Sequence, residues 1–362
     1  MNKRFEALDA FRGLCALSVV VFHMRFIGSI TEFDFFRGSE LFVEFFFVLS
    51  GFVLAHGYGF KENLNFKTFM KARFFRLYPL HFTMFIFVII FNIIKLLAVQ
   101  YSGLSFSSEA FSGVNTISQI IPNLLLIQSW TPFTEPYSFN GPSWSISIEF
   151  YMYALLFTSI VLFKVNKVLA WFLISLIAFL LILLESELLV STVLRGLSCF
   201  FGGAFTYVIY KKLSHLKPSY ILGSIIEGLL LLSVFYIVQS DLEYRSIIGP
   251  ITFIFTVLFF AFESGYFSEL LKVRPFQYAG KLSYSIYMTH FVLFFYITAL
   301  FKILNHFTNF EMIVIIDEVR FKTLDSIVLN NIAVLSILAL VIFISSLTYK
   351  YIELKGQKLN RK

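Results

Sequence analysis

The chain has 362 residues, of which 58% are hydrophobic and only 14% are charged. A mean hydropathy of +0.80 excludes an ordinary soluble domain. The net charge of +7 gives no reason to expect nucleic acid as a partner, because the basic residues gather in short connections between apolar runs. The two cysteines lie inside apolar runs and indicate neither a disulfide framework nor a metal cluster. We therefore expect an all-α, polytopic bundle of transmembrane helices.

Apolar runs of suitable length predict about ten membrane spans. The expected ranges are 8–27, 39–57, 79–100, 142–163, 168–184, 188–210, 219–238, 246–262, 282–301 and 328–349. The first span should remain in the membrane, because no small-residue cleavage site follows it. The expected organisation is one integral-membrane domain over residues 1–362, with no appended extracytoplasmic domain.

Charges in the connections orient these spans. The connection after the second span and the C-terminal tail are rich in Lys and Arg, whereas residues 101–140 contain neither. Because cytoplasmic loops carry the excess of Lys and Arg, we expect both termini in the cytoplasm and residues 101–140 outside. The apolar segment 117–130 is short and broken by Pro122, so it should be re-entrant or interfacial rather than an eleventh span.

The first span carries two ionisable residues, Arg12 and His23. Ionisable groups inside a span are costly and usually face a partner or a cavity. Eleven positions are very nearly three helical turns, so the two side chains should share one stripe, roughly 16 Å apart along the axis. A snorkelling arginine and a histidine bonded to a neighbouring helix would explain either residue alone. For the pair we favour a functional role.

Two further segments carry notable polar groups. Glu44, inside the second span, needs a partner, and Ser50-Gly51 indicates a close helix contact more readily than a catalytic serine. Arg73 and Arg76 share a helix face before the third span, and the arginine fork suits phosphate. An interfacial anchor on anionic lipid would explain that segment better if it stood alone.

Three later spans add more polar groups. Glu149, a turn or two into the fourth span, could orient a catalytic group or form a structural ion pair. Arg195 lies near the outer end of the sixth span, where an outward-snorkelling side chain is a fair alternative. The ninth span has Ser283, Tyr287 and His290 on roughly one side, which favours an interhelical hydrogen-bond set over a nucleophile site.

Six motifs in this order resemble the acyltransferase type 3 family, bacterial integral-membrane O-acyltransferases that act on surface glycans. They are DAFRGLCALSVVVFH, VEFFFVLSGF, ARFFRLYPLH, WSISIEFYMY, GKLSYSIYMTHF and YKYIELKG, and they run from the first span to the tail. This chain has Glu44 where the family usually has aspartate and Phe42 where glycine is common. Phe150 replaces a frequent second acid, and the usual proline is absent after Glu353.

The resemblance implies a membrane O-acyltransferase in the bacterial cytoplasmic (inner) membrane. Its donor would be a cytoplasmic acyl-CoA, in the simplest case acetyl-CoA, which is a co-substrate and not a permanently bound cofactor. Its acceptor would be a hydroxyl group of an extracytoplasmic or lipid-linked glycan, and membrane lipid would be its other partner. No metal-ligand spacing is present in the sequence.

Acyl transfer from a thioester to a hydroxyl needs a grip on the nucleotide phosphates, a base, and donors for the developing oxyanion. Histidine, with a reference pKa of about 6.5, suits the role of base, which we assign to His23. Arg73 and Arg76 are the expected phosphate grip, and Arg12 is expected to line the path of the pantetheine arm. A supporting polar site should comprise Glu44, Ser145, Arg195, Ser283, Tyr287 and His290.

Two other functions are compatible with buried charges in a helical bundle. A transporter or flippase of a lipid-linked glycan would use them along its substrate pathway, but the sequence shows no internal repeat of hydropathy. A membrane module that only binds acyl-CoA or lipid would show binding without turnover. Consumption of acyl-CoA by the purified protein separates the three functions.

Overall fold

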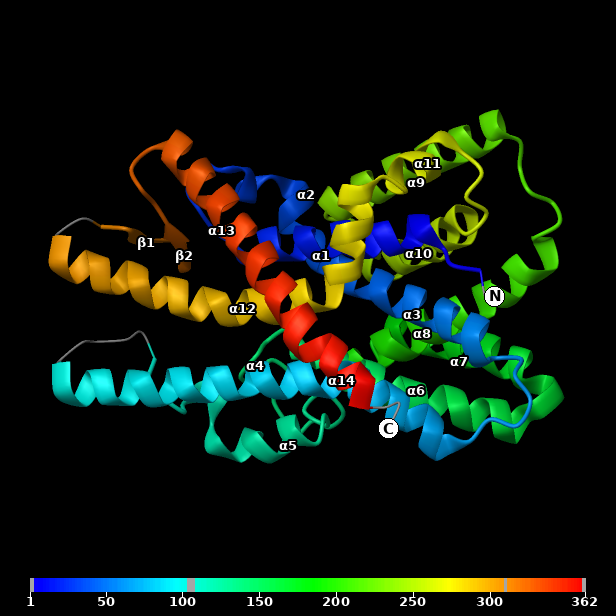
Figure 1. The fold of residues 1–362 in the computed structure, drawn as a ribbon, viewed down its shortest axis with the longest axis horizontal. Helices are drawn as coiled ribbons and strands as arrows, with labels where there is room; N and C mark the ends of the chain where they lie inside the picture. Colours follow the sequence, from blue (N-terminus) through cyan, green and yellow to red (C-terminus); the bar gives the residue numbers. More distant parts are fainter. Residues whose placement is uncertain (1–2, 103–107, 309–310, 360–362) are drawn as a thin grey trace. The chain divides into compact units, whose positions relative to one another are not determined.

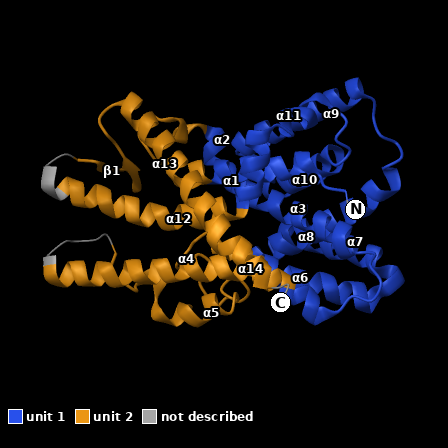
Figure 2. Cartoon of the chain, in the orientation of Figure 1, with its two compact units in different colours: residues 1–19, 34–71, 149–283 blue, residues 20–33, 72–148, 284–362 orange. Residues whose placement is uncertain are grey.

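The structure is a computed structural model that describes residues 3–102, 108–308 and 311–359 (Figure 1). The chain forms two compact units that are interleaved in sequence (Figure 2). Unit 1 comprises Met1–Val19, Asp34–Lys71 and Glu149–Ser283, and unit 2 comprises Val20–Phe33, Ala72–Ile148 and Tyr284–Lys362. Four helices contribute residues to both units: α1 (Glu6–His23), α4 (Phe66–Ser102), α6 (Ser143–Phe163) and α12 (Arg274–Thr308).

The remaining helices belong to one unit each. Unit 1 contains α2 (Asp34–Arg37), α3 (Phe42–Tyr58), α7 (Lys167–Leu183), α8 (Ser191–Leu213), α9 (Tyr220–Gln239), α10 (Arg245–Phe260) and α11 (Tyr266–Leu271). Unit 2 contains α5 (Ile120–Leu124), the strands β1 (Ile313–Ile316) and β2 (Val319–Lys322), α13 (Ile327–Thr348), a π-helical turn at Tyr349–Glu353 and α14 (Leu354–Leu359). Single 3₁₀ turns occur at Ile30–Glu32, Ser39–Leu41, Gly113–Asn115, Ile117–Gln119 and Lys164–Asn166.

Each of the ten predicted ranges falls on a helix, namely α1, α3, α4, α6, α7, α8, α9, α10, α12 and α13. Among the described residues, seven helical stretches are long and apolar enough to cross a membrane. One of them, Ser143–Leu183, contains both α6 and α7, and α10 is a shorter apolar helix of 16 residues. The chain is therefore a helical membrane protein. The number of crossings and the side of the termini stay predictions.

A β-hairpin corrects the expectation that the fold is entirely helical. β1 and β2 pair antiparallel with Ile316 opposite Val319, which leaves a two-residue loop of Asp317 and Glu318. Both loop residues have positive φ, 47° and 63°, as a type I′ turn requires. The run Ile313–Ile316 consists only of β-branched residues, which favour strands over helices.

The segment 117–130 does not form a span. Its one α-helix, α5, has five residues and therefore covers only about 8 Å. Asn123, on α5, donates to Ser138 at 2.7 Å, and its backbone carbonyl bonds to the His81 ring of α4 at 3.0 Å. The segment is thus folded against α4 within unit 2, in agreement with the prediction that it is not an eleventh span.

Two glycines bring α3 and α8 into backbone contact. A Cβ added at Gly51 would lie 1.8 Å from the carbonyl oxygen of Phe200, and one at Gly203 would lie 1.9 Å from that of Val48. Neither position can hold a larger residue unless the helices separate. The prediction that Ser50-Gly51 marks a close helix contact is confirmed.

Replacement of Gly51 by Ala is expected to lower the melting temperature clearly, because the new methyl group must displace the α8 backbone. Overpacking of this kind typically costs about 1–3 kcal/mol. Gly57, on the same helix, has nothing within 4 Å of an added Cβ, so Gly57→Ala should be neutral or stabilising by about 0.5–1 kcal/mol. Thermal unfolding of both variants in one detergent compares them, and equal melting temperatures would contradict this account of the α3–α8 contact.

The predicted orientation is tested with single cysteines in a Cys15→Ala, Cys199→Ala background. Glu62 and Ser118 are both exposed and belong to connections predicted on opposite sides of the membrane. An impermeant thiol reagent applied to intact cells should label Ser118→Cys, whereas Glu62→Cys should react only after the membrane is opened. Labelling of both from one side would overturn the orientation.

Candidate functional site

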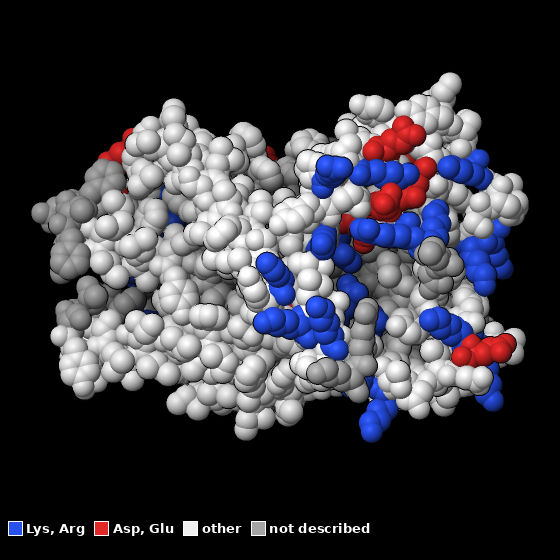
Figure 3. Space-filling view, in the orientation of Figure 1, with Lys and Arg blue, Asp and Glu red and all other residues white. Residues whose placement is uncertain are grey.

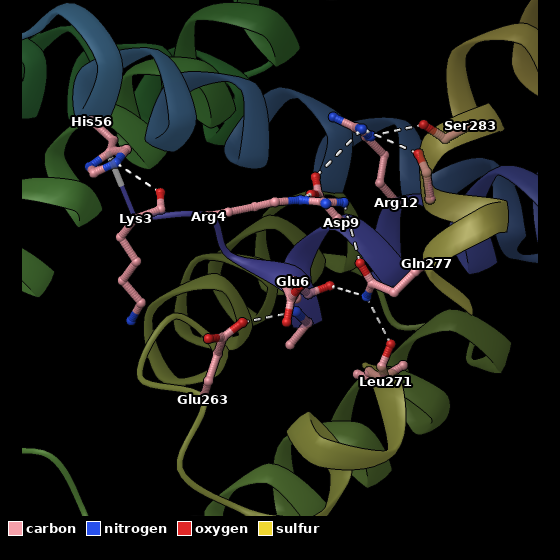
Figure 4. A network of polar contacts seen from close by, with 12 residues as sticks. Lys3, Arg4, Glu6, Asp9, Arg12, His56, Glu263, Leu271, Gln277 and Ser283 are labelled. Atoms are coloured by element: carbon pink, nitrogen blue, oxygen red, sulfur yellow. Dashed lines mark hydrogen bonds and ion pairs between the residues drawn. The ribbon is translucent and has the colours of Figure 1, made fainter. Parts of the chain in front are cut away.

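Arg12 of α1 is held by α12 within unit 1 (Figure 4). Its Nε donates to the Ser283 hydroxyl at 2.8 Å and its Nη2 to the Gly280 carbonyl at 3.2 Å. Asp9, one turn earlier on α1, lies 3.6 Å from Nη2. The side chain is 29% exposed, so its direction is set by these partners and not by snorkelling into water.

The beginning of α1 is fixed by polar contacts that surround Arg12 (Figure 4). Arg4 donates to Asp9 at 2.7 Å, and this hydrogen bond raises the pKa of Arg4. Gln277 donates to the Glu6 carbonyl at 2.8 Å, and the Glu263 carboxylate accepts the Ala7 amide at 3.1 Å. The Ala7 amide in the first turn of α1 thereby gains a negatively charged partner, which a helix N-terminus favours.

Glu44 and Arg195 form an ion pair inside unit 1. The Arg195 Nε lies 2.5 Å from Glu44 Oε1, and the Glu44 side chain is only 4% exposed. Glu44 therefore has the partner that its position in a span requires. Arg195 points at this carboxylate, so outward snorkelling does not describe it. Removal of either member would leave a poorly solvated charge, which is far more costly than the pair itself.

Glu149 has a different environment, also within unit 1. One of its carboxylate oxygens accepts hydrogen bonds from the Ser50 and Tyr153 hydroxyls. No basic side chain in the described ranges lies within ion-pair distance of it. Two neutral donors thus replace the structural ion pair considered from the sequence, and the carboxylate keeps its other oxygen for a further donor.

Unit 2 brings the rings of His23 and His290 together. His23 is the last residue of α1 and is half-buried, and its ring centroid lies 5.2 Å from that of His290 on α12. His290 is fully buried, and its Nδ1 bonds to the Ile286 carbonyl at 3.1 Å. Since a carbonyl only accepts, Nδ1 carries the hydrogen and Nε2 has a lone pair. Within the described residues Nε2 has no hydrogen-bond partner.

The first turn of α6 is bonded to α12 beside this histidine pair. The Ser145 and Tyr287 hydroxyls lie 2.9 Å apart, and the Tyr287 hydroxyl also donates to the Pro142 carbonyl at 3.0 Å. Asn140, which precedes α6, donates to the Met288 carbonyl at 3.0 Å. These bonds fix the α12 segment on which His290 lies, a positioning role that the sequence did not reveal for Asn140.

Arg73 and Arg76 lie on α4 in unit 2 and are both half-buried. The helix continues through Pro79, and the Tyr284 hydroxyl of α12 bonds to the Leu77 carbonyl at 2.6 Å. A Cβ added at Gly356 on α14 would lie 2.7 Å from the Pro79 ring. Contacts from α12 and α14 thus fix the part of α4 that follows the two arginines.

The predicted site residues therefore form local groups in two units. Unit 1 holds Arg12, Glu44, Glu149, Arg195 and Ser283, and unit 2 holds His23, Arg73, Arg76, Ser145, Tyr287 and His290. Across the described ranges, no three His, Cys, Asp or Glu side chains are arranged to hold a metal ion. The groups offer a histidine pair, hydrogen-bond donors and arginines, which is a set suited to proton transfer and anion binding.

Comparison with known proteins identifies the family. Residues 5–350 match the model of a family described as an acyltransferase domain, the type 3 acyltransferases. The chain belongs to this family. It is 33% identical over 168 residues to the acyltransferase MdmB of Streptomyces mycarofaciens, an alignment that covers 41% of this chain and 38% of that protein.

A second relative is protein 2 in the picA locus of Rhizobium radiobacter. It is 45% identical over 83 residues, which cover 22% of this chain and 41% of that protein. The chain thus spans about two fifths of the length of each of these relatives. No solved structure matches it.

Glu149→Gln tests whether the charge of this side chain matters apart from its hydrogen bonds. The amide oxygen of Gln can still accept from Ser50 and Tyr153, so the melting temperature should stay close to that of the wild type. Glu149→Leu removes the acceptor, leaves two hydroxyls without it, and should cost about 1–3 kcal/mol. If Gln destabilises as much as Leu, the hydrogen-bond account of Glu149 is wrong.

Proposed function

We propose that this protein is a membrane O-acyltransferase. It moves an acyl group, in the simplest case acetyl, from acyl-CoA to a hydroxyl of an extracytoplasmic or lipid-linked glycan. The match of residues 5–350 to an acyltransferase family carries this proposal. The histidine pair in unit 2 supports it, because acyl transfer to a hydroxyl needs a group that accepts a proton near neutral pH.

His23 is the proposed base, and His290 is the proposed positioning residue beside it. His290 Nε2 has a lone pair in a buried place, where an unsatisfied acceptor costs about 1–3 kcal/mol. A ring N–H of His23 or the acceptor hydroxyl would satisfy it. Either bond would hold the reacting groups in one geometry, which is a large part of the rate advantage of an enzyme.

The proposed reaction is a direct transfer. The acceptor oxygen attacks the thioester carbon while its proton passes to His23. The bond between that carbon and sulfur then breaks, and the leaving thiolate takes the proton from the imidazolium. The products are the O-acyl ester and free CoA, so the protein needs neither a nucleophilic serine nor a nucleophilic cysteine.

The remaining roles are assigned from the chemistry of the side chains. Arg73 and Arg76 grip the donor diphosphate, since a guanidinium donates two hydrogen bonds at once to phosphate oxygens. Arg12 lines the path of the pantetheine arm, and Glu149 supports the site through its free carboxylate oxygen. The proposed location is the bacterial inner membrane, with membrane lipid around the bundle.

The purified protein, supplied with acetyl-CoA and a hydroxyl-bearing glycan acceptor, should release CoA only when the acceptor is present. His23→Ala should reduce this release by about 10²–10⁴-fold, the usual worth of positioned acid–base catalysis. Binding of acetyl-CoA should persist in the variant, because His23 is not assigned to the donor grip. Release of CoA is followed with a thiol reagent.

His23→Gln is the matched control, since it keeps a hydrogen-bonding side chain but cannot act as a base. It should be nearly as inactive as His23→Ala. If Gln retains near-normal turnover, His23 is a packing residue. A protein that binds acetyl-CoA but releases no CoA with any acceptor is a binding module, and one that instead moves a lipid-linked glycan across vesicles is a flippase.

A further inference from the structure

Two lysines of unit 1 converge on one aromatic ring where three helices begin or end. Phe60 follows the end of α3, Lys167 begins α7, and Lys211 lies near the end of α8. The ammonium nitrogens of Lys167 and Lys211 lie 4.8 Å and 4.1 Å from the centroid of the Phe60 ring. All three residues belong to unit 1, so this cluster is defined within one compact body.

The Phe60 ring is packed against two other aromatic rings. It packs edge-on against Trp171, with ring centroids 6.4 Å apart, and at a tilt against Tyr207, with centroids 6.2 Å apart. Trp171 is fully buried, and its indole nitrogen donates to Ser159 at 2.8 Å. Phe60 nevertheless remains 40% exposed, so a solute can reach the cluster from outside the bundle.

The two ammonium groups repel one another. Each gains only about 0.5–1 kcal/mol from an exposed ring face. Within the part of the chain that the structure describes, neither has a carboxylate within ion-pair distance. An anion bound between them would remove the repulsion and accept hydrogen bonds from both. On the visible face, Lys and Arg side chains lie over unit 1 and also over α14 of unit 2 (Figure 3).

We infer that Phe60, Lys167 and Lys211 form a subsite for the 3′-phosphate of acyl-CoA. This inference rests on the proposed function, which supplies the donor. Acyl-CoA carries two separate anionic groups, a diphosphate and a 3′-phosphate monoester. The proposed arginine grip suits the diphosphate. A monoester carries a charge of about −1.5 to −2 at pH 7 and is matched by two compact ammonium charges.

The test compares CoA with 3′-dephospho-CoA, which lacks only this phosphate. Wild-type protein in phosphatidylcholine nanodiscs should bind CoA more tightly than dephospho-CoA in isothermal titration calorimetry. The double variant Lys167→Gln, Lys211→Gln should weaken CoA binding by about tenfold or more, the worth of charge-assisted hydrogen bonds. Its affinity for dephospho-CoA should stay within about twofold of the wild type.

Two comparison variants sharpen the result. Lys212→Gln with Lys217→Gln removes the same number of charges from the same end of α8 and the connection after it, and should leave CoA binding unchanged. Arg73→Lys with Arg76→Lys should weaken CoA and dephospho-CoA alike, because both ligands contain the diphosphate. Phe60→Leu removes the ring that both lysines contact but keeps an apolar side chain. It should weaken the binding of CoA and leave the binding of dephospho-CoA unchanged.

The subsite is wrong if the Lys167, Lys211 variant weakens both ligands equally, or if the Lys212, Lys217 control weakens CoA as much. The subsite is also wrong if the Lys167, Lys211 variant weakens CoA binding only in nanodiscs that contain phosphatidylglycerol, since the lysines then bind a lipid headgroup. Wild-type protein that turns over acetyl-CoA but binds CoA and dephospho-CoA equally overturns the subsite alone. Wild-type protein that neither binds nor consumes acetyl-CoA overturns the proposed function as well.

Discussion

The cost of placing charged groups in an apolar helical protein explains the contacts of its buried charged side chains. Glu44 is matched by Arg195, and Arg12 is held by a hydroxyl and a carbonyl. Glu227, which is 1% exposed on α9, accepts the Gly265 and Ser268 amides at 2.9 Å each. Because an unpaired buried charge is so unfavourable, each of these side chains fixes one helix against another segment of unit 1.

Close packing provides the second condition for this arrangement. Gly51 and Gly203 let α3 and α8 touch along their backbones, and Gly13 with Gly280 does the same for α1 and α12. A Cβ at Gly280 would lie 2.2 Å from the Asp9 carbonyl, so the α12 backbone beside Arg12 is set by the absence of a side chain. Small residues at helix contacts thus determine which polar partners come within hydrogen-bond distance.

We assign chemistry to three of the polar groups that lack a complete set of partners. His290 keeps a buried lone pair beside His23, and Glu149 keeps one carboxylate oxygen. Lys167 and Lys211 share a ring instead of a carboxylate. A buried acceptor without a partner, or a pair of cations without a counter-charge, is a position where a ligand can bind.

The sequence by itself determined the class, the helices and the family. Apolar runs place the ten helical ranges correctly, because burial of the backbone in lipid leaves helices as the only solution for such runs. The hairpin has a local signal in the β-branched run Ile313–Ile316, but Asp317-Glu318 is not one of the glycine-containing pairs typical of a two-residue turn. The need of Glu44 for a partner was also evident from the sequence, because a carboxylate inside an apolar run is costly unless it is paired or solvated.

Only the tertiary structure decided which residues meet. Glu44 and Arg195 are 151 positions apart, and the Tyr287–Ser145 bond joins residues 142 positions apart. The Ser50 partner of Glu149, the unpartnered nitrogen of His290 and the shared ring of Lys167 and Lys211 have no signal in the sequence. From the sequence, Lys167 and Lys211 indicate only the orientation of the spans, because lysines in short connections are typical of the cytoplasmic side. Contacts between distant segments depend on helix packing, which is set by side-chain shape and glycine placement across several helices at once and not by the pattern along any one of them.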